Sequence, residues 1–97
     1  MVTIKVDVYG GRLPVPMRIE IDNRNNPKIE PFEKGQSFTK QLNLSKGVRT
    51  INFTLKNPID GYTVITISGI SANGNEFEMK KKIEGNEIRT AIFKLTL

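Results

Sequence analysis

The chain has 97 residues, 15 of them Lys or Arg and 10 Asp or Glu, giving a net charge of +5. This length suits one domain over residues 1–97, and 37% hydrophobic residues is typical of a folded chain rather than a disordered one. Cys, His and Trp are absent, which excludes disulfides, Cys or His metal sites, thiol nucleophiles and histidine acid–base chemistry. No apolar run is long enough to span a bilayer.

Apolar and polar residues alternate with a period of two from the start of the chain, which predicts β-strands and no helix. The first two strands are expected at 2–9 and 15–22. Pro14 and Pro16 place the start of the second strand at an edge or a bend, because proline donates no ladder hydrogen bond. The polar segment 23–34 has no periodicity, and we expect a long loop that crosses from one sheet to the other.

Segments 37–44 and 48–56 alternate again and are separated by a short turn that contains Gly47, a pattern typical of a hairpin. The strongest turn signal follows, in the run Asn57-Pro58-Ile59-Asp60-Gly61. Proline fixes its own φ in such a turn, and an Asp-Gly pair tolerates positive φ.

The strand expected at 62–70 has apolar residues on both faces, so we expect it to be buried on both sides or covered by a loop. Asn73-Gly74 then predicts a type I′ hairpin to the next strand. A further turn at Gly85-Asn86 leads into the final strand.

The pattern therefore predicts about seven antiparallel strands, at 2–9, 15–22, 37–44, 48–56, 62–70, 76–83 and 88–97. Seven short strands separated by regular turns are typical of an all-β, immunoglobulin-like sandwich, with a small closed barrel as the alternative. We favour the sandwich, because the long 23–34 connection suits a crossing between two sheets.

A resemblance is carried by four short segments: Gly35-Gln36-Ser37-Phe38, Leu42-Asn43-Leu44-Ser45-Lys46-Gly47, Ile51-Asn52-Phe53 and Ala72-Asn73-Gly74-Asn75. Together they resemble bacterial Ig-like repeat domains, the small sandwiches strung along secreted and surface proteins. Those domains often show a Gly-x-Phe entry, a Leu-x-x-Gly hairpin and a Gly-Asn turn, whereas here Gln36 and Ser37 separate the Gly from its Phe. The segment 11–16 is similar to transthyretin-like sandwiches. Both resemblances imply a fold and no functional residue.

The only run of charge is Lys80-Lys81-Lys82, and Arg89 and Lys94 lie on the strand expected to pair with it. These five residues are a candidate strip for nucleic acid, an anionic polysaccharide or anionic lipid, which they would bind by counterion release. Lys81 falls on the apolar face of its strand, so we expect either a bend in the strand there or a place for Lys81 at the rim of the sandwich with its stem on apolar surface.

The alternative for this run is an edge strand whose lysines prevent sheets from pairing edge to edge. We favour it because no aromatic residues are interleaved to stack bases, and because carboxylates flank the run and neutralise it. Those carboxylates are Glu76, Glu78, Glu84 and Glu87.

The polar loop offers candidate partner-binding residues, namely Asn23, Arg24, Asn25, Asn26 and Phe32. Its oxygen ligands, with Asp22 and Glu30, also suit a calcium site. The spacing fits no calcium loop, however, and Arg24 and Lys28 put positive charge within it. We therefore expect no metal and assign these side chains to local bonds with the main chain.

Catalytic residues are not expected. Without His or Cys a mechanism needs paired carboxylates or an activated Lys or Ser. Asp7 and Glu20 are candidates to face each other on neighbouring strands, but both fall on the solvent face. No glycine-rich phosphate loop precedes a helix, so we expect neither an enzyme nor a cofactor.

The expected function is a non-catalytic module that binds another protein, or itself, or spaces domains in a bacterial envelope or surface assembly. The alternatives are a binding module for an anionic polymer, acting through the basic strand, and a small structural component of a phage-tail-like assembly. We expect no membrane insertion. Met1–Lys5 does not resemble a signal peptide, so the compartment stays open: we expect an extracellular or periplasmic protein if such a signal has been removed, and a cytoplasmic one otherwise.

Overall fold

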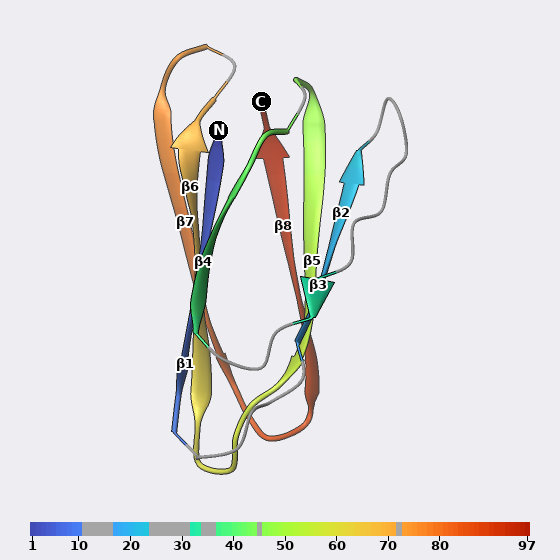
Figure 1. Ribbon diagram of the computed structural model, residues 1–97, viewed down its shortest axis with the longest axis vertical. Coiled ribbons are helices and arrows are strands. Elements are labelled where there is room, and N and C mark those ends of the chain that lie inside the picture. Colours follow the sequence, from blue (N-terminus) through green and yellow to red (C-terminus); the bar gives the residue numbers. More distant parts are fainter. Residues whose placement is uncertain (11–16, 24–31, 34–36, 45, 72) are drawn as a thin grey trace.

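The computed structural model describes residues 1–10, 17–23, 32–33, 37–44, 46–71 and 73–97. They form eight strands in two antiparallel sheets that face each other (Figure 1). The strands are β1 (Val2–Tyr9), β2 (Met17–Asn23), β3 (Phe32–Glu33), β4 (Phe38–Leu42), β5 (Val48–Lys56), β6 (Tyr62–Ile70), β7 (Glu76–Glu84) and β8 (Ile88–Thr96). Sheet A has the order β4-β1-β6-β7 and sheet B the order β3-β2-β5-β8. Because β3 has only two residues, the prediction of an all-β sandwich with about seven strands is confirmed.

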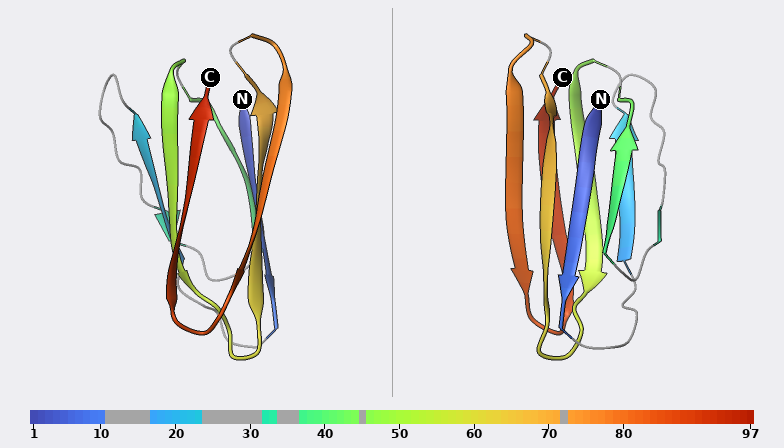
Figure 2. Two further views of the ribbon diagram at one scale, coloured as in Figure 1. Left: turned by 180° about the vertical axis from the view of Figure 1, so that it is seen from behind. Right: turned by 60° about the vertical axis from the view of Figure 1, so that its left-hand side comes forward.

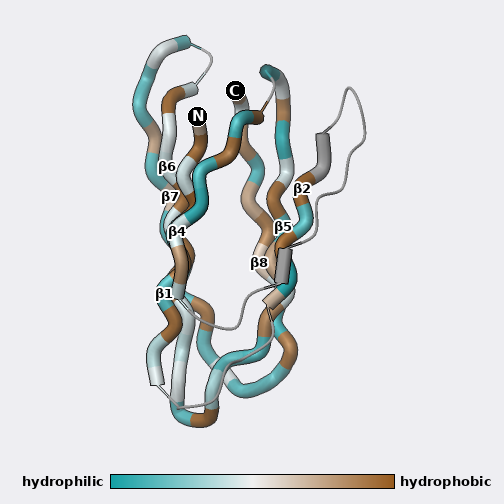
Figure 3. Tube along the Cα trace, in the orientation of Figure 1, coloured by the Kyte–Doolittle hydropathy of each residue, from teal (hydrophilic) through white to brown (hydrophobic). Residues whose placement is uncertain are grey.

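The core lies between the sheets and is built by the period-two alternation. Along most of β1, β5 and β8 every second residue is buried, while the residues between them face solvent or lie half-buried. Hydrophobic and hydrophilic residues accordingly alternate along the trace (Figure 3). At its centre, Phe53 of β5 and Phe93 of β8 meet edge to face with ring centroids 5.5 Å apart. The buried apolar residues are Val2, Ile4, Val6, Met17, Ile19, Ile21, Leu42, Ile51, Phe53, Leu55, Ile65, Ile67, Ala91, Phe93 and Leu95.

The expected hairpin between 37–44 and 48–56 is wrong. The strand β4 pairs with β1 in sheet A, and β5 pairs with β2 and β8 in sheet B. The short turn therefore carries the chain between sheets, and Gly47 takes a φ of 115° within it. An alternating pattern decides which face of a strand is buried, and that face is equally well buried whether two consecutive strands lie side by side or opposite each other.

The expectation that segment 23–34 crosses from one sheet to the other is also wrong. Both β2 and β3 belong to sheet B and pair through Arg18–Glu33 and Ile19–Phe32, so the strands on either side of this connection lie in the same sheet. The crossing to sheet A comes afterwards, between Glu33 and Phe38. The proline-containing start expected for the second strand lies outside the described residues.

The expected hairpin at Asn73-Gly74 exists, because β6 and β7 pair along their whole length. It is not a type I′ turn, since Gly74 has a φ of 84° and Asn73 has no positive φ. Ser71 and Asn75 close the loop by a main-chain hydrogen bond of 2.8 Å, leaving three residues between them with the glycine last. A glycine in this place is the rule for three-residue hairpin loops.

Strand β6 is buried on one face only. Thr63, Ile65 and Ile67 point into the core, whereas Val64 is half-buried and Ile70 is exposed on the outer face. The expectation that both faces are covered is therefore wrong. Val64 lies between Asp7 and Lys82 on the neighbouring strands, which explains why it is partly shielded in an outer sheet face.

Candidate functional site

The five basic residues of the predicted strip do not form one surface. The run lies on β7, which pairs with β6, while Arg89 and Lys94 lie on β8, which pairs with β5. The expected pairing of these two strands is therefore wrong, because the turn after β7 carries the chain across to the other sheet. Among the described strands, both are the edges of their sheets, on the same side of the sandwich (Figure 2). Lys94 points from the outer face of sheet B, away from Lys80 and Lys82 on the outer face of sheet A.

Lys81 reaches from one edge to the other. Its Nζ donates a hydrogen bond of 2.9 Å to the main-chain carbonyl of Ile92 on β8 and lies 4.9 Å from the centroid of the Phe93 ring. The side chain thus spans the gap between the sheets at their rim, where its stem lies over apolar surface and its charge meets a carbonyl and an aromatic face. Of the two alternatives that the face pattern left open, a bend in the strand or a place at the rim, these contacts agree with the rim.

Carboxylates lie close to two of the other basic groups on this side, those of Lys82 and Arg89. Lys82 Nζ lies 3.0 Å from a carboxylate oxygen of Glu84 and 4.5 Å from the ring centroid of Tyr62. The hydrogen bond to Glu84 and the negative charge of that carboxylate raise the pKa of Lys82 above its ordinary value of 10.5. Arg89 lies 3.8 Å from Glu87. The run is therefore partly neutralised, as the edge-protecting alternative requires.

The predicted partner-binding loop lies mostly outside the described residues, and so does the loop considered for calcium. Arg24, Asn25 and Asn26 are not described. Asn23 is the last residue of β2, and Phe32 is the first residue of β3, opposite Ile19. Placing Phe32 in a loop was wrong, because it takes part in sheet B.

The two carboxylates considered for catalysis are separated by the whole sandwich. Asp7 projects from the outer face of sheet A, where it lies 3.9 Å from Lys5, and Glu20 projects from the outer face of sheet B, 3.0 Å from Arg18. Their strands are not neighbours, so the expectation that they face each other is wrong. Among the described residues, no three acidic side chains come together in a way that could hold a metal ion.

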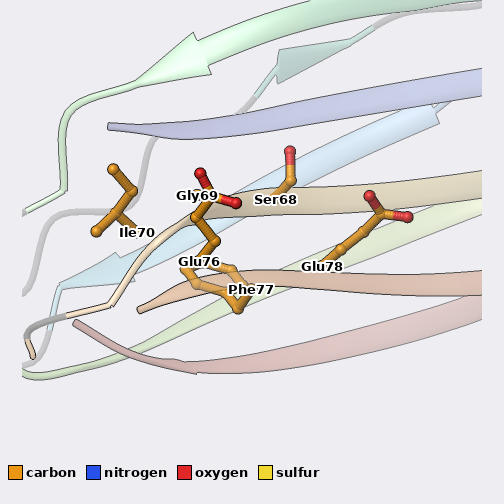
Figure 4. A pocket seen from close by; sticks show the side chains of 6 residues that line it. All are labelled: Ser68, Gly69, Ile70, Glu76, Phe77 and Glu78. Atoms are coloured by element: carbon orange, nitrogen blue, oxygen red, sulfur yellow. The ribbon is translucent and has the colours of Figure 1, made fainter. Parts of the chain in front are cut away.

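An open hollow of about 420 Å³ lies at the end of sheet A that carries the β6–β7 hairpin (Figure 4). Ser68, Glu76 and Glu78 point to the same side of it, and Ile70 lines its end. A Cβ on Gly69 would lie 3.3 Å from the Phe77 ring, so the ring packs close to the main chain of β6 beside the hollow. The hollow offers two solvated carboxylates, and nothing encloses it.

The opposite end of the sandwich is organised around one buried amide. Asn57 is 1% exposed, and its Nδ2 donates to the main-chain carbonyls of Ile83 at 3.0 Å and Gly85 at 2.9 Å. Its Oδ1 accepts a hydrogen bond of 2.6 Å from the hydroxyl of Thr63. The side chain of Asn86 donates in turn to the Asn57 carbonyl at 2.7 Å. The turn after β5 and the turn after β7 are thereby joined.

Close main-chain contact adds the end of β1 to this arrangement. A Cβ on Gly61 would lie 2.3 Å from the carbonyl oxygen of Tyr9, and one on Gly10 would lie 2.7 Å from the Cα of Gly61. Directly before Gly61, Asp60 takes a φ of 59°, the positive value expected for the Asp60-Gly61 turn. We call residues 9–10, 57–61 and 84–88 together the turn end; it lies opposite the two termini (Figure 1).

Large apolar side chains are displayed on the turn end. Ile59 at the tip of the turn is 75% exposed, and Ile88 at the start of β8 is 74% exposed. Tyr9 is 45% exposed and stacks on Tyr62 with centroids 4.7 Å apart. Sequence analysis identified this turn but missed the buried amide. The available signal was an Asn directly before Pro58 and six residues before a Thr on an inward position.

Comparison of this chain with protein-family models, with curated proteins and with solved structures finds no match. The described residues contain no helix with the length and apolarity needed to cross a bilayer. Fold and local geometry therefore define the class, an all-β sandwich of two antiparallel sheets.

Proposed function

We propose that this chain is a non-catalytic protein-interaction module whose contact surface is the turn end. The supporting observation is that Ile59 and Ile88 are about three-quarters exposed on two turns that Asn57 holds together. A mobile loop loses conformational entropy when it is ordered by a partner, whereas turns already held by hydrogen bonds lose little. Apolar side chains held in this way suit a surface that binds a partner without rearranging.

We propose further that the module works in a bacterial envelope or surface assembly. The resemblance to bacterial Ig-like domains implies an envelope or surface assembly, in which such a module binds another protein or spaces domains. The likeness is to the sandwich architecture and not to the order of the strands. In constant-type immunoglobulin domains the first two strands share a sheet, whereas β1 and β2 lie in different sheets here.

The test is affinity capture from cells with the immobilised domain, washed at low and at high salt. Three variants accompany the wild type: Ile59→Ser and Ile88→Ser at the turn end, and Ile70→Ser as the matched control. Ile70 is 56% exposed and lies at the opposite end of the sandwich. We expect a protein retained at high salt by the wild type and by I70S, and released from I59S or I88S.

Other outcomes of the same experiment identify the alternatives. Nucleic acid or glycan recovered at low salt only would support the anionic-polymer reading, since contacts between a lysine and a phosphate are lost as salt rises. Capture of the same protein by all four forms would contradict the turn end as the contact surface. If no partner is recovered, a role as a spacer between domains is the interpretation that remains. A homo-oligomer of the wild type would favour a structural component of a phage-tail-like assembly.

A further inference from the structure

The free edge of β8 has a defined set of outward main-chain groups. Gly47 and Leu97 exchange both of their main-chain hydrogen bonds, at 2.8 and 2.9 Å, just beyond the pair Val48–Thr96. In an antiparallel ladder, hydrogen-bonded and non-bonded pairs alternate along the strands. Because the register between β5 and β8 is continuous, alternate residues of β8 turn both N–H and C=O away from β5. These residues are Ile88, Thr90, Ile92, Lys94 and Thr96.

Ile92 stands at the centre of this set. Two antiparallel copies of β8 related by a two-fold axis at Ile92 would place Thr90 opposite Lys94 and Ile88 opposite Thr96. All five outward residues then find a main-chain partner, and no two like charges stand opposite each other. The Ile92 side chain, which is 54% exposed, would meet its counterpart on the outer face. The edge is therefore compatible with pairing to itself in the register that uses its whole length.

Lys81 already donates to the main-chain carbonyl at the centre of this register, that of Ile92. Its Nζ donates to the Ile92 carbonyl at 2.9 Å, and the neighbouring Phe93 ring holds the ammonium in place. In the two-fold register, that same carbonyl would accept from Ile92 N–H of the other copy. A cation across an edge strand is also a general device against edge-to-edge association.

We propose that the free edge of β8 is a strand-pairing surface for a second copy of this chain and that Lys81 keeps it closed. Lys80 and Lys82 act differently, because they project from the outer face of sheet A and do not reach β8. Pairing along β8 would bring the β7 strands of two copies to the same side, so the lysine run also repels. Lys80 and Lys82 thus oppose pairing only through their charge, whereas Lys81 opposes it by binding a main-chain acceptor of β8.

The experiment measures the oligomeric state of the full chain by size-exclusion chromatography with light scattering, over a range of protein concentrations. The variant is Lys81→Met, which keeps an apolar stem over Phe93 and removes the donor. Lys80→Met is the matched control, with the same loss of charge on the same strand. We expect K81M to form dimers with a dissociation constant at least about tenfold lower than that of K80M, a difference of about 1.4 kcal/mol.

A double variant tests whether the pairing uses the β8 edge. Thr90→Pro removes an outward N–H without removing a donor from the ladder with β5. We expect K81M/T90P to return to the monomer. Equal association of K81M and K80M would overturn the proposal in favour of simple repulsion, and a monomeric, folded K81M would overturn it outright. If circular dichroism shows K81M unfolded, Lys81→Val, which also has no donor, is measured instead, with the same expected dimer.

Discussion

The hydroxyl of Thr63 donates a hydrogen bond of 2.6 Å to Oδ1 of Asn57, and both side chains are buried. Thr63 is the second residue of β6 in sheet A, and Asn57 follows the last residue of β5 in sheet B. The pair therefore connects the two sheets by a polar contact at the end of an apolar core. A buried amide is tolerated in this place because both its nitrogen and its oxygen have partners.

Replacing Asn57 by Ala is expected to lower the free energy of unfolding by about 3 kcal/mol. The change leaves the buried Thr63 hydroxyl and two partly buried main-chain carbonyls without their partner. Urea unfolding followed by circular dichroism measures the loss. Asn86→Ala is the control, because it removes only the bond to the Asn57 carbonyl and is expected to cost about 1 kcal/mol. Equal, small losses in both variants would show that the amide is dispensable.

Two glycine replacements separate close packing from backbone strain. Gly61→Ala is expected to cost about 2–4 kcal/mol, because the new Cβ would lie 2.3 Å from a main-chain oxygen of Tyr9. Gly74→Ala, on the exposed hairpin, meets nothing within 4 Å and is strained only by its φ of 84°. Its expected cost is about 1–2 kcal/mol. Thermal unfolding of both variants gives the order, and a more stable G61A than G74A would contradict the tight joint between β1 and the turn.

Arg49 is expected to behave as a structural residue despite its charge. It is fully buried, and its guanidinium donates to the main-chain carbonyl of Val48 at 2.8 Å and to that of Lys46. Arg49→Met is expected to lower the free energy of unfolding by about 2–4 kcal/mol, since buried carbonyls lose charged donors. Arg18→Met, which removes an exposed ion pair with Glu20, is expected to cost less than about 1 kcal/mol. Chemical denaturation compares the two, and a loss in R49M no larger than in R18M would refute this role.

The stability of the fold is expected to depend on pH through Lys82. Because Glu84 raises its pKa in the folded chain, its contribution to stability is fully present below the ordinary pKa of 10.5 and is lost as the pH rises through the raised value. Glu84→Gln is expected to bring the pKa of Lys82 down toward 10.5, measured by NMR titration of the side-chain amine. Glu87→Gln, on the neighbouring turn, is the control and is expected to leave this pKa where it is. A Lys82 pKa insensitive to E84Q would exclude the ion pair as its cause.

The basic residues show why a charge pattern in the sequence did not translate into a site. Lys80, Lys81 and Lys82 are consecutive, but the pleat of β7 directs Lys81 to the core side and its two neighbours to the outer face. Lys94 lies on the other sheet, although 88–97 was expected to pair directly with the lysine-bearing strand. Sequence spacing specifies the face of each side chain, whereas the pairing partner depends on where the connecting turn delivers the chain.

Apart from the short β3 and the outer face of β6, the sequence by itself determined the strands and their buried faces. Their observed bounds agree with the expected ones to within a few residues, because the period-two pattern of Val, Ile, Leu and Phe leaves one burial arrangement for each strand. Only the tertiary structure decided which strands pair, since main-chain hydrogen bonds are the same for every residue and carry no record of the partner. For the same reason, the amide of Asn57 and the ammonium of Lys81 acquired their roles only once distant carbonyls had been brought to them.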